Sequence, residues 1–212
     1  MKKIIIVGAG SVGGHIASNL ALYGIEGRLM GFVDDDLSKH GSNFCGFPIL
    51  GDVAWLMDKA DLEVIIGIAF PRMKAIIVNK LAVNSELEFP TLVAKNAWIS
   101  NGTTLGKGVV IYPGTCINYG SQIQDFVVMN MNCAVGHHCT IGKFSSLAPT
   151  VSLGGHSTVG FSVELGIGCS TLQGVNIGSQ TVVGGQCLVH QNLPENVVAV
   201  GVPATIKRHL TR

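Results

Sequence analysis

Two adjacent histidines in the segment Val135-Gly136-His137-His138-Cys139 are the residues of this chain best suited to chemistry. A neutral imidazole can take a proton near pH 7, and apolar, uncharged surroundings suit that role. Between residues 93 and 193 the charged residues are only Lys95, Lys107, Asp125, Lys143 and Glu164. A lone histidine at a turn is usually a solvated turn residue. The pair therefore predicts a general base because the segment around it is almost free of charge.

A second candidate site is the glycine-rich turn Gly8-Ala9-Gly10-Ser11-Val12-Gly13. It follows a buried strand expected at residues 2–8, and a helix is expected from the turn to about residue 23. The run Asp34-Asp35-Asp36 comes about 20–25 positions later, at the end of a second strand expected at residues 28–33. A βαβ nucleotide-binding unit has its ribose-binding carboxylate at this distance.

Three interpretations of the glycine-rich turn remain open: a nucleotide or nucleotide-sugar site, a redox dinucleotide site, or a tight turn without a ligand. Further elements are expected as a short helix at 53–59, a strand at 63–69 and a helix from Pro71 to about residue 84. Together they make a unit of about half a full dinucleotide-binding domain, with room for one nucleotide.

The rest of the chain repeats with a period of six. Every sixth residue from Val93 to Val189 is a large aliphatic residue in 16 of 17 cases, with Thr171 as the exception. The fifth place of each hexad is Ala, Ser, Thr, Val or Cys until Leu193, and the second place is Gly in eight hexads. This period fits neither an amphipathic helix nor an alternating strand. It predicts a parallel β-helix, with one large and one small residue of each hexad inside.

Three hexads should close one triangular coil, so residues 18 apart should stack at about 4.8 Å. We expect the second-place glycines to supply backbone freedom at the turns. The stacking predicts that Tyr119 lies below His137, Gly155 above His137, and His156 above His138.

Charge and cysteine content exclude several classes of protein. The net charge is +1 with 13% charged residues, so no basic field for nucleic acid or an anionic membrane is present. Four of six cysteines occupy the small fifth place, no C-x-x-C occurs, and the histidines lack zinc-like spacing. We expect free thiols in a reducing compartment and no metal site.

Hydropathy and surface charge give expectations about location and assembly. The apolar run after Met1 is too short for a signal peptide, and no run is long enough to span a bilayer. A cytoplasmic protein is therefore expected. An uncharged β-helix face would be a liability in a monomer, so we expect a homotrimer with clefts between neighbouring copies.

The combination GAGSVG…VDDD, unbroken hexads, VGHHCTIG and a terminal GVPA resembles the NeuD/PglD-like family of hexapeptide-repeat sugar acetyltransferases. The resemblance covers essentially the whole chain. It implies a left-handed parallel β-helix at residues 89–212, preceded by a Rossmann-like β-α-β-α unit at residues 1–88. It also implies a trimer with acetyl-CoA between adjacent β-helices and a nucleotide-activated amino sugar held by the amino-terminal unit.

The resemblance assigns roles to particular residues. The family's catalytic histidine corresponds to His137, and an asparagine lining its acceptor site corresponds to Asn130. Its acetyl-contacting backbone N–H corresponds to Gly155. The nucleotide-contacting residues correspond to Gly10 with Ser11 and to Asp34 with Asp35.

The chain departs from the family in three places. The family's catalytic histidine is usually followed by Asp or Glu, whereas this chain has His138, which we count among the catalytic candidates. A second family histidine is replaced by Ser146, which we expect beside acetyl-CoA. The Gly-His of the family's first turn is Ser11-Val12 here.

The resemblance implies acetyl-CoA-dependent N-acetylation of a nucleotide-linked amino sugar, such as a UDP- or dTDP-4-amino-4,6-dideoxyhexose. O-acetylation of a sugar such as sialic acid is an alternative, because the same base can activate a hydroxyl group. A nucleotide-sugar-binding scaffold with weak catalysis is a third possibility, because the carboxylate after the histidine is missing.

Overall fold

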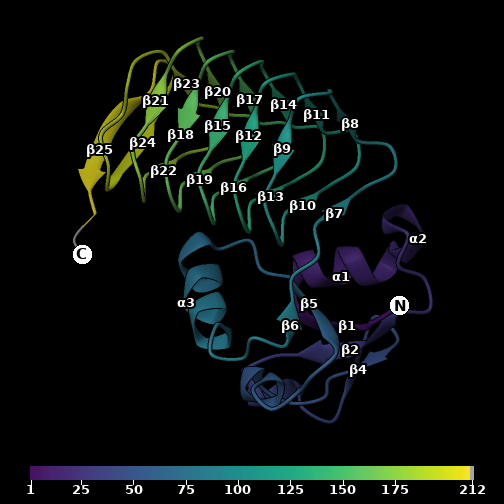
Figure 1. Cartoon of the computed structure of the whole chain (residues 1–212). Helices are drawn as coiled ribbons and strands as arrows, with labels where there is room; N and C mark the ends of the chain where they lie inside the picture. Colours follow the sequence, from purple (N-terminus) through teal and green to yellow (C-terminus); the bar gives the residue numbers. More distant parts are fainter. Residues whose placement is uncertain (211–212) are drawn as a thin grey trace. The chain divides into compact units, whose positions relative to one another are not determined.

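The fold is that of a computed structural model of the chain, of which residues 1–210 are described (Figure 1). It divides into two compact units, Met1–Pro90 and Thr91–Arg212, each considered separately below. No helix in the described part of the chain is long and apolar enough to cross a membrane.

The amino-terminal unit is built on a four-stranded parallel sheet in the order β2-β1-β5-β6. Its strands are β1 (Lys3–Val7), β2 (Leu29–Val33), β5 (Leu62–Ile66) and β6 (Leu87–Glu88). The helices are α1 (Ser11–Ser18), α2 (Leu20–Tyr23) and α3 (Pro71–Leu81), with 3₁₀ turns at Leu37–Lys39 and Val53–Leu56. A small hairpin joins β3 (Asn43–Phe44) to β4 (Phe47–Pro48). The Rossmann-like β-α-β-α order is therefore as expected.

The first helix is interrupted, which the sequence pattern did not predict. Asn19 separates α1 from α2 with φ −134° and ψ 37°, and its side-chain amide donates to the carbonyl of His15 at 2.8 Å. A short polar side chain that binds nearby backbone competes with the helix, which explains the break. The strand expected at 63–69 ends earlier, at Ile66.

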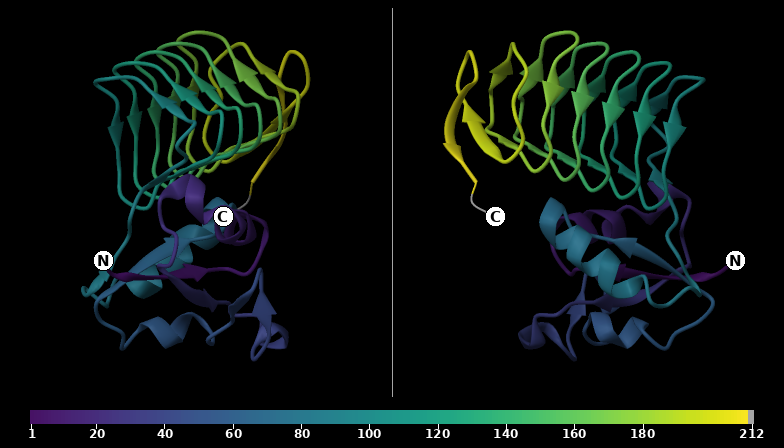
Figure 2. Two further views of the ribbon diagram at one scale, coloured as in Figure 1. Left: turned by 90° about the vertical axis from the view of Figure 1, so that its right-hand side faces the viewer. Right: turned by 60° about the vertical axis from the view of Figure 1, so that its left-hand side comes forward.

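The second unit is a left-handed parallel β-helix with three sheets, and its stacked coils are clearest in Figure 2. One sheet contains β7 (Leu92–Val93), β10 (Val110–Ile111), β13 (Val128–Met129), β16 (Ser146–Leu147), β19 (Glu164–Leu165), β22 (Val182–Val183), β24 (Val197–Val200) and β25 (Thr205–His209). The second contains β8 (Trp98–Ile99), β11 (Cys116–Ile117), β14 (Ala134–Val135), β17 (Ser152–Leu153), β20 (Ser170–Thr171) and β23 (Leu188–Val189). The third contains β9 (Thr104–Leu105), β12 (Gln122–Ile123), β15 (Thr140–Ile141), β18 (Thr158–Val159) and β21 (Asn176–Ile177).

The predicted register of 18 holds through the body of the β-helix. Ile117 pairs with Val135, and Ile123 pairs with Ile141. The large first-place residues from Ile111 onward are buried, and so are the fifth-place residues from Val109 onward. The mainly β fold class and the inward-facing pattern are confirmed.

Fifth-place hydroxyls and thiols also link successive coils. Ser121 donates to the carbonyl of Gly136 at 2.9 Å, and the Cys139 thiol donates to the carbonyl of Gly154 at 3.3 Å. The four fifth-place cysteines are buried and free, as expected. Burial raises the pKa of the Cys133 thiol to about 12, so this group stays protonated near neutral pH.

The expected role of the second-place glycines is wrong. Positive φ occurs instead at the fourth place, where every residue from Gly102 to Gln186 has φ between 56° and 79°. At seven of the eight second-place glycines an added Cβ would come within 2.7 Å of an atom of the next coil. At these seven positions glycine is therefore favoured because neighbouring coils approach closely, and not because the turn is left-handed.

The hexad register changes at the carboxyl-terminal end. Leu193 bridges to Ile177, 16 residues before it, and Val198 pairs with Val182 at the same offset. Leu193 therefore takes the place of a large first-place residue, not that of a small fifth-place residue. The antiparallel pair β24–β25 then ends the described part of this sheet.

Close approach between coils predicts different costs at two glycines. Gly160→Ala would place Cβ 2.7 Å from the backbone nitrogen of Ser179, so the coils must separate. We expect it to lower the free energy of unfolding by about 1–3 kcal/mol. Gly174→Asn is the control, because Gly174 has φ 74° with no atom near its Cβ position, and Asn132 occupies the same hexad place with φ 59°. We expect Gly174→Asn to lower the free energy of unfolding, measured with urea, by less than about 1 kcal/mol. Equal losses of stability in the two variants would contradict this explanation.

Candidate active site

His137 lies at the third place of its hexad, in the turn that follows β14. The Tyr119 ring stacks on one face of the imidazole with centroids 5.6 Å apart and planes within 16°. Gly155 lies on the other side, where an added Cβ would be 2.8 Å from Nε2 of His137. The column Tyr119–His137–Gly155 expected from the 18-residue register is therefore present, and the glycine makes room for the imidazole.

His138 lies beside His137 at the fourth place, with φ 56°. Its Nδ1 is 3.1 Å from Nδ1 of His137, a hydrogen-bond distance. The His156 ring stacks on it with centroids 5.1 Å apart and planes within 4°, as the register predicted. Gly120 leaves space on the other side, because a Cβ there would be 2.8 Å from Cδ2 of His138.

This arrangement leaves Nε2 as the available nitrogen of His137, since Nδ1 is engaged with His138. Nε2 lies next to Gly155, whose backbone N–H has no acceptor among residues 1–210. Tyr119 has the same hexad place two coils before Gly155, and its backbone N–H donates to Oδ1 of the preceding residue, Asn118, at 2.8 Å. Gly154 precedes Gly155 and offers no such acceptor. A possible base and a free N–H donor therefore lie at the same corner of the β-helix.

The three imidazoles also raise the question of a metal site. Ligand atoms of His137, His138 and His156 lie within 4.8 Å of one another. Zinc bonds imidazole nitrogen at about 2.0–2.1 Å, along a lone pair in the plane of the ring. The rings of His138 and His156 are stacked and parallel, so their lone pairs do not converge on one point. The rings as arranged therefore do not fit a metal ion.

Two residues assigned by resemblance lie elsewhere on the β-helix. Asn130 follows β13 and Ser146 lies in β16, both in the eight-stranded sheet, whereas His137 follows β14 in the six-stranded sheet. The Asn130 Oδ1 accepts from the Met131 N–H at 2.9 Å. One chain alone does not bring Asn130 or Ser146 to the histidine corner, so a site that joins them needs a second copy.

The four predicted nucleotide-contacting residues, Gly10, Ser11, Asp34 and Asp35, do line one hollow of about 370 Å³ in the amino-terminal unit. The Asp34 carboxylate accepts hydrogen bonds from the backbone of the loop after β2 and of the glycine-rich turn. Its Oδ2 accepts from the Ala9 N–H at 2.8 Å, and its Oδ1 accepts from the Asp36 N–H at 2.9 Å. Asp34 therefore joins the glycine-rich turn to the loop after β2.

Lys39 is a residue of this hollow that the sequence reasoning missed. Its Nζ donates to Asp34 Oδ2 at 2.9 Å and to the Ala9 carbonyl at 3.3 Å. Burial alone would raise the pKa of the Asp34 carboxyl, but Lys39 and the N–H groups of Asp36 and Ala9 hold that pKa below its usual value. The hollow thus contains an ion pair beside the glycine-rich turn, with the exposed Phe70 on its rim.

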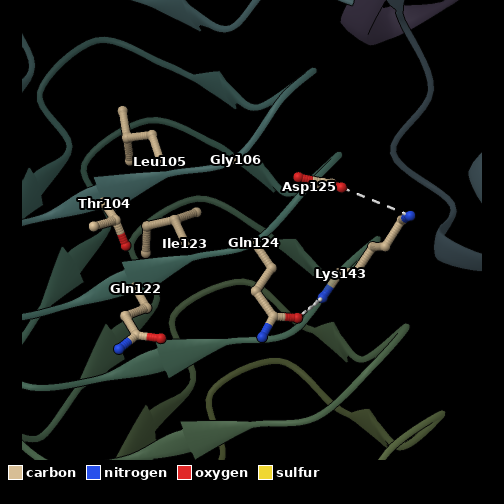
Figure 3. Close-up of a pocket in the computed structure, with 8 residues that line it drawn as sticks. All are labelled: Thr104, Leu105, Gly106, Gln122, Ile123, Gln124, Asp125 and Lys143. Atoms are coloured by element: carbon tan, nitrogen blue, oxygen red, sulfur yellow. Dashed lines mark hydrogen bonds and ion pairs between the residues drawn. The ribbon is translucent and has the colours of Figure 1, made fainter.

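Figure 3 shows a separate hollow on the β-helix, lined by residues of β9 and β12, the turns that follow them, and Lys143 after β15. Its volume is about 340 Å³. Its charged side chains, Asp125 and Lys143, lie 3.7 Å apart and face each other. They neutralise one another, so this hollow offers a ligand no unpaired charge.

Comparison with known proteins gives matches for both units. Residues 3–81 match the PglD N-terminal domain family. The chain is 29% identical over 129 residues to galactoside O-acetyltransferase of Escherichia coli, covering 50% of this chain and 64% of that enzyme. It is 30% identical over 116 residues to serine acetyltransferase of Staphylococcus aureus, covering 51% and 53%. The chain thus spans between half and two thirds of these relatives' lengths.

Two solved structures match nearly the full length. PerB from Caulobacter crescentus, in complex with CoA and GDP-perosamine, is 29% identical with a TM-score of 0.86, covering 98% of each chain. The acetyltransferase domain of PglB from Neisseria gonorrhoeae has a TM-score of 0.86, covering 97% of this chain and all of that one. Its 24% identity shows the fold alone. From its PglD-type amino-terminal domain through its β-helix, the chain is similar over nearly its whole length to sugar acetyltransferases of the NeuD/PglD-like kind.

Proposed function

We propose that this protein transfers the acetyl group of acetyl-CoA to the amino group of a nucleotide-linked amino sugar. The observation that carries the proposal is the free Nε2 of His137 beside the free N–H of Gly155. PerB, a protein of similar length and fold, binds CoA and GDP-perosamine, an amino-sugar nucleotide. A cytoplasmic location, where acetyl-CoA is available, fits this role.

The reaction needs one base and one oxyanion donor. The neutral amine attacks the thioester carbonyl, and Nε2 of His137 removes a proton from the amine nitrogen. The Gly155 N–H stabilises the developing oxyanion, an interaction worth about 10²–10³-fold in rate. The tetrahedral intermediate then breaks its C–S bond, and His137 returns the proton to the thiolate, which gives CoA and the N-acetylated sugar.

The hollow beside the glycine-rich turn is proposed to hold the nucleotide. Backbone N–H groups of the glycine-rich turn and the Lys39 ammonium suit phosphate oxygens. The exposed Phe70 side chain offers an apolar surface for a base or sugar. Asp34 is proposed to contribute indirectly, by fixing the glycine-rich turn against the loop after β2. Asp35 lies in the same region, where its Oδ1 accepts from the Val53 N–H at 2.9 Å.

The complete site is proposed to form in a homotrimer. Asn130 and Ser146 lie on a different sheet from His137, and they meet a histidine corner only if another copy supplies it. The six-stranded sheet presents a row of exposed, uncharged small side chains at Cys116, Ala134 and Ser152. Such a flat strip suits close packing between identical β-helices.

Sugar O-acetylation is the second candidate, favoured by the match to galactoside O-acetyltransferase. Thiol release from acetyl-CoA separates the two, measured with GDP-, UDP- and dTDP-linked amino sugars, galactosides and free sialic acid as acceptors. We expect release with at least one nucleotide-linked amino sugar. Release only with hydroxyl acceptors would select O-acetylation, and release with none would contradict enzymatic acetyl transfer.

His137→Ala should lower kcat by about 10²–10⁴-fold with little change in acetyl-CoA binding, because only the base is removed. Gly155→Ala should also lower kcat strongly, because its Cβ would displace the imidazole. Gly185→Ala is the matched control: it has the same hexad place, and its nearest neighbour is the Ile167 carbonyl oxygen at 3.2 Å. Normal turnover in His137→Ala would rule out His137 as the base.

Lys39→Ala should weaken nucleotide-sugar binding about tenfold or more, since it removes the cation beside the glycine-rich turn. Acetyl-CoA binding should not change, because the two ligands are assigned to different units. Calorimetry with each ligand measures both effects, and Lys59→Ala, a lysine outside this hollow, is the control. Loss of acetyl-CoA binding in Lys39→Ala would reverse the assignment.

Light scattering should give a mass near three times that of the 22.2-kDa chain. Ala134→Asp, which adds a charge to the exposed face of β14, should shift the protein towards monomer and reduce activity together. Val83→Asp, at a residue 73% exposed on the amino-terminal unit, controls for an added charge. A stable, active monomer would refute the shared site.

A further inference from the structure

The contact between His137 and His138 restricts where their protons lie. The two Nδ1 atoms are 3.1 Å apart, and a hydrogen bond between them needs one N–H and one lone pair. Either His137 donates from Nδ1, or His138 does. A neutral imidazole carries a proton on only one of its two nitrogens. The two alternatives therefore differ in whether Nε2 of His137, on the far side of the ring, carries the proton.

Only one alternative leaves a base at the proposed reaction site. If His138 donates, neutral His137 carries its proton on Nε2, and the nitrogen beside Gly155 cannot accept another. If His137 donates from Nδ1, its Nε2 has a free lone pair facing Gly155. In that state His138 accepts at Nδ1 and carries its own proton on Nε2.

We propose that His138 is a positioning residue that acts as a neutral hydrogen-bond acceptor and holds His137 in the tautomer with a proton on Nδ1. The inference rests on the proposed function, because it specifies how the base of that reaction is kept ready. A carboxylate at this position would accept the same bond as an anion. This chain performs the task with an uncharged group in a segment poor in charge.

The packing around His138 supports a fixed ring. His156 stacks on one side, Gly120 leaves room on the other, and Tyr119 meets the ring edge-on with centroids 5.0 Å apart. The titratable groups facing His138 from the adjacent turns are Tyr119, His137 and His156. None of the ion pairs of the described chain involves these side chains.

The proposal has a consequence for the pH dependence of the reaction. A protonated His138 has N–H at both nitrogens and cannot accept from His137. Activity then requires two unprotonated imidazoles and not one. Once the rate is divided by the fraction of acceptor amine that is unprotonated, the acidic limb of log(kcat/KM) should therefore fall with a limiting slope of about 2, in place of about 1 for a single base.

Substitution at His138 separates an acceptor from a merely space-filling residue. His138→Asn keeps an acceptor oxygen near the position of Nδ1, and Asn tolerates the left-handed backbone. We expect it to retain kcat within about tenfold of the parent and to reduce the limiting slope to about 1. His138→Ala should lower kcat by about 10²-fold with KM for acetyl-CoA unchanged. His156→Asn is the control, because it changes the stacked neighbour and should keep the slope of about 2.

Nitrogen NMR of the ¹⁵N-histidine-labelled protein tests the tautomer without turnover. Near pH 8 we expect His137 to carry its proton on Nδ1 and His138 on Nε2, with His137 reverting to a mixture in His138→Ala. A proton on Nε2 of His137 in the parent, or a slope of about 2 that survives in His138→Asn, would overturn the proposal. If no amino sugar is acetylated, the proposed function fails, while the NMR result still decides the tautomer.

Discussion

Hydrogen bonding between successive coils at a spacing of 18 residues is the constraint on which the β-helix and its candidate site depend. This register stacks Ile117 under Val135 in the core, and it also stacks Tyr119 under His137 at the corner. Coils can approach this closely because a second-place residue such as Gly136 has no side chain to meet the next coil. The geometry of the imidazoles is therefore a direct product of the repeat.

The repeat explains why much of the structure could be predicted from sequence. Its strict period gave the buried positions and the neighbours of His137, since each follows from counting in steps of 18. The period does not show why a position is glycine, because close approach between coils and a left-handed backbone both favour this residue. Lys39 was missed because its contact with Asp34 depends on the path of an irregular loop, for which no periodic signal exists. The changed register at Leu193 was missed because two residues are lost where the repeat ends.

The two units use charge in different ways. In the amino-terminal unit Lys39 and backbone N–H groups surround the Asp34 carboxylate, so the proposed nucleotide site contains an organised ion pair. At the histidine corner the neighbours are imidazoles, a phenol and glycines. None of the ion pairs of the described residues reaches this corner, and in our proposal His138 orients the base through a neutral hydrogen bond. This difference agrees with the roles proposed here, a charged ligand in one unit and proton transfer from a neutral amine in the other.

The most direct test of the account is a crystal structure of the protein with CoA and the nucleotide-linked amino sugar that it acetylates. We predict that the acceptor nitrogen lies within about 3.2 Å of Nε2 of His137, with the CoA sulfur close to the Gly155 N–H. Asn130 should reach this acceptor from another copy of the chain. An acceptor nitrogen held well away from the histidine corner, with His137 in contact with solvent alone, would contradict the account.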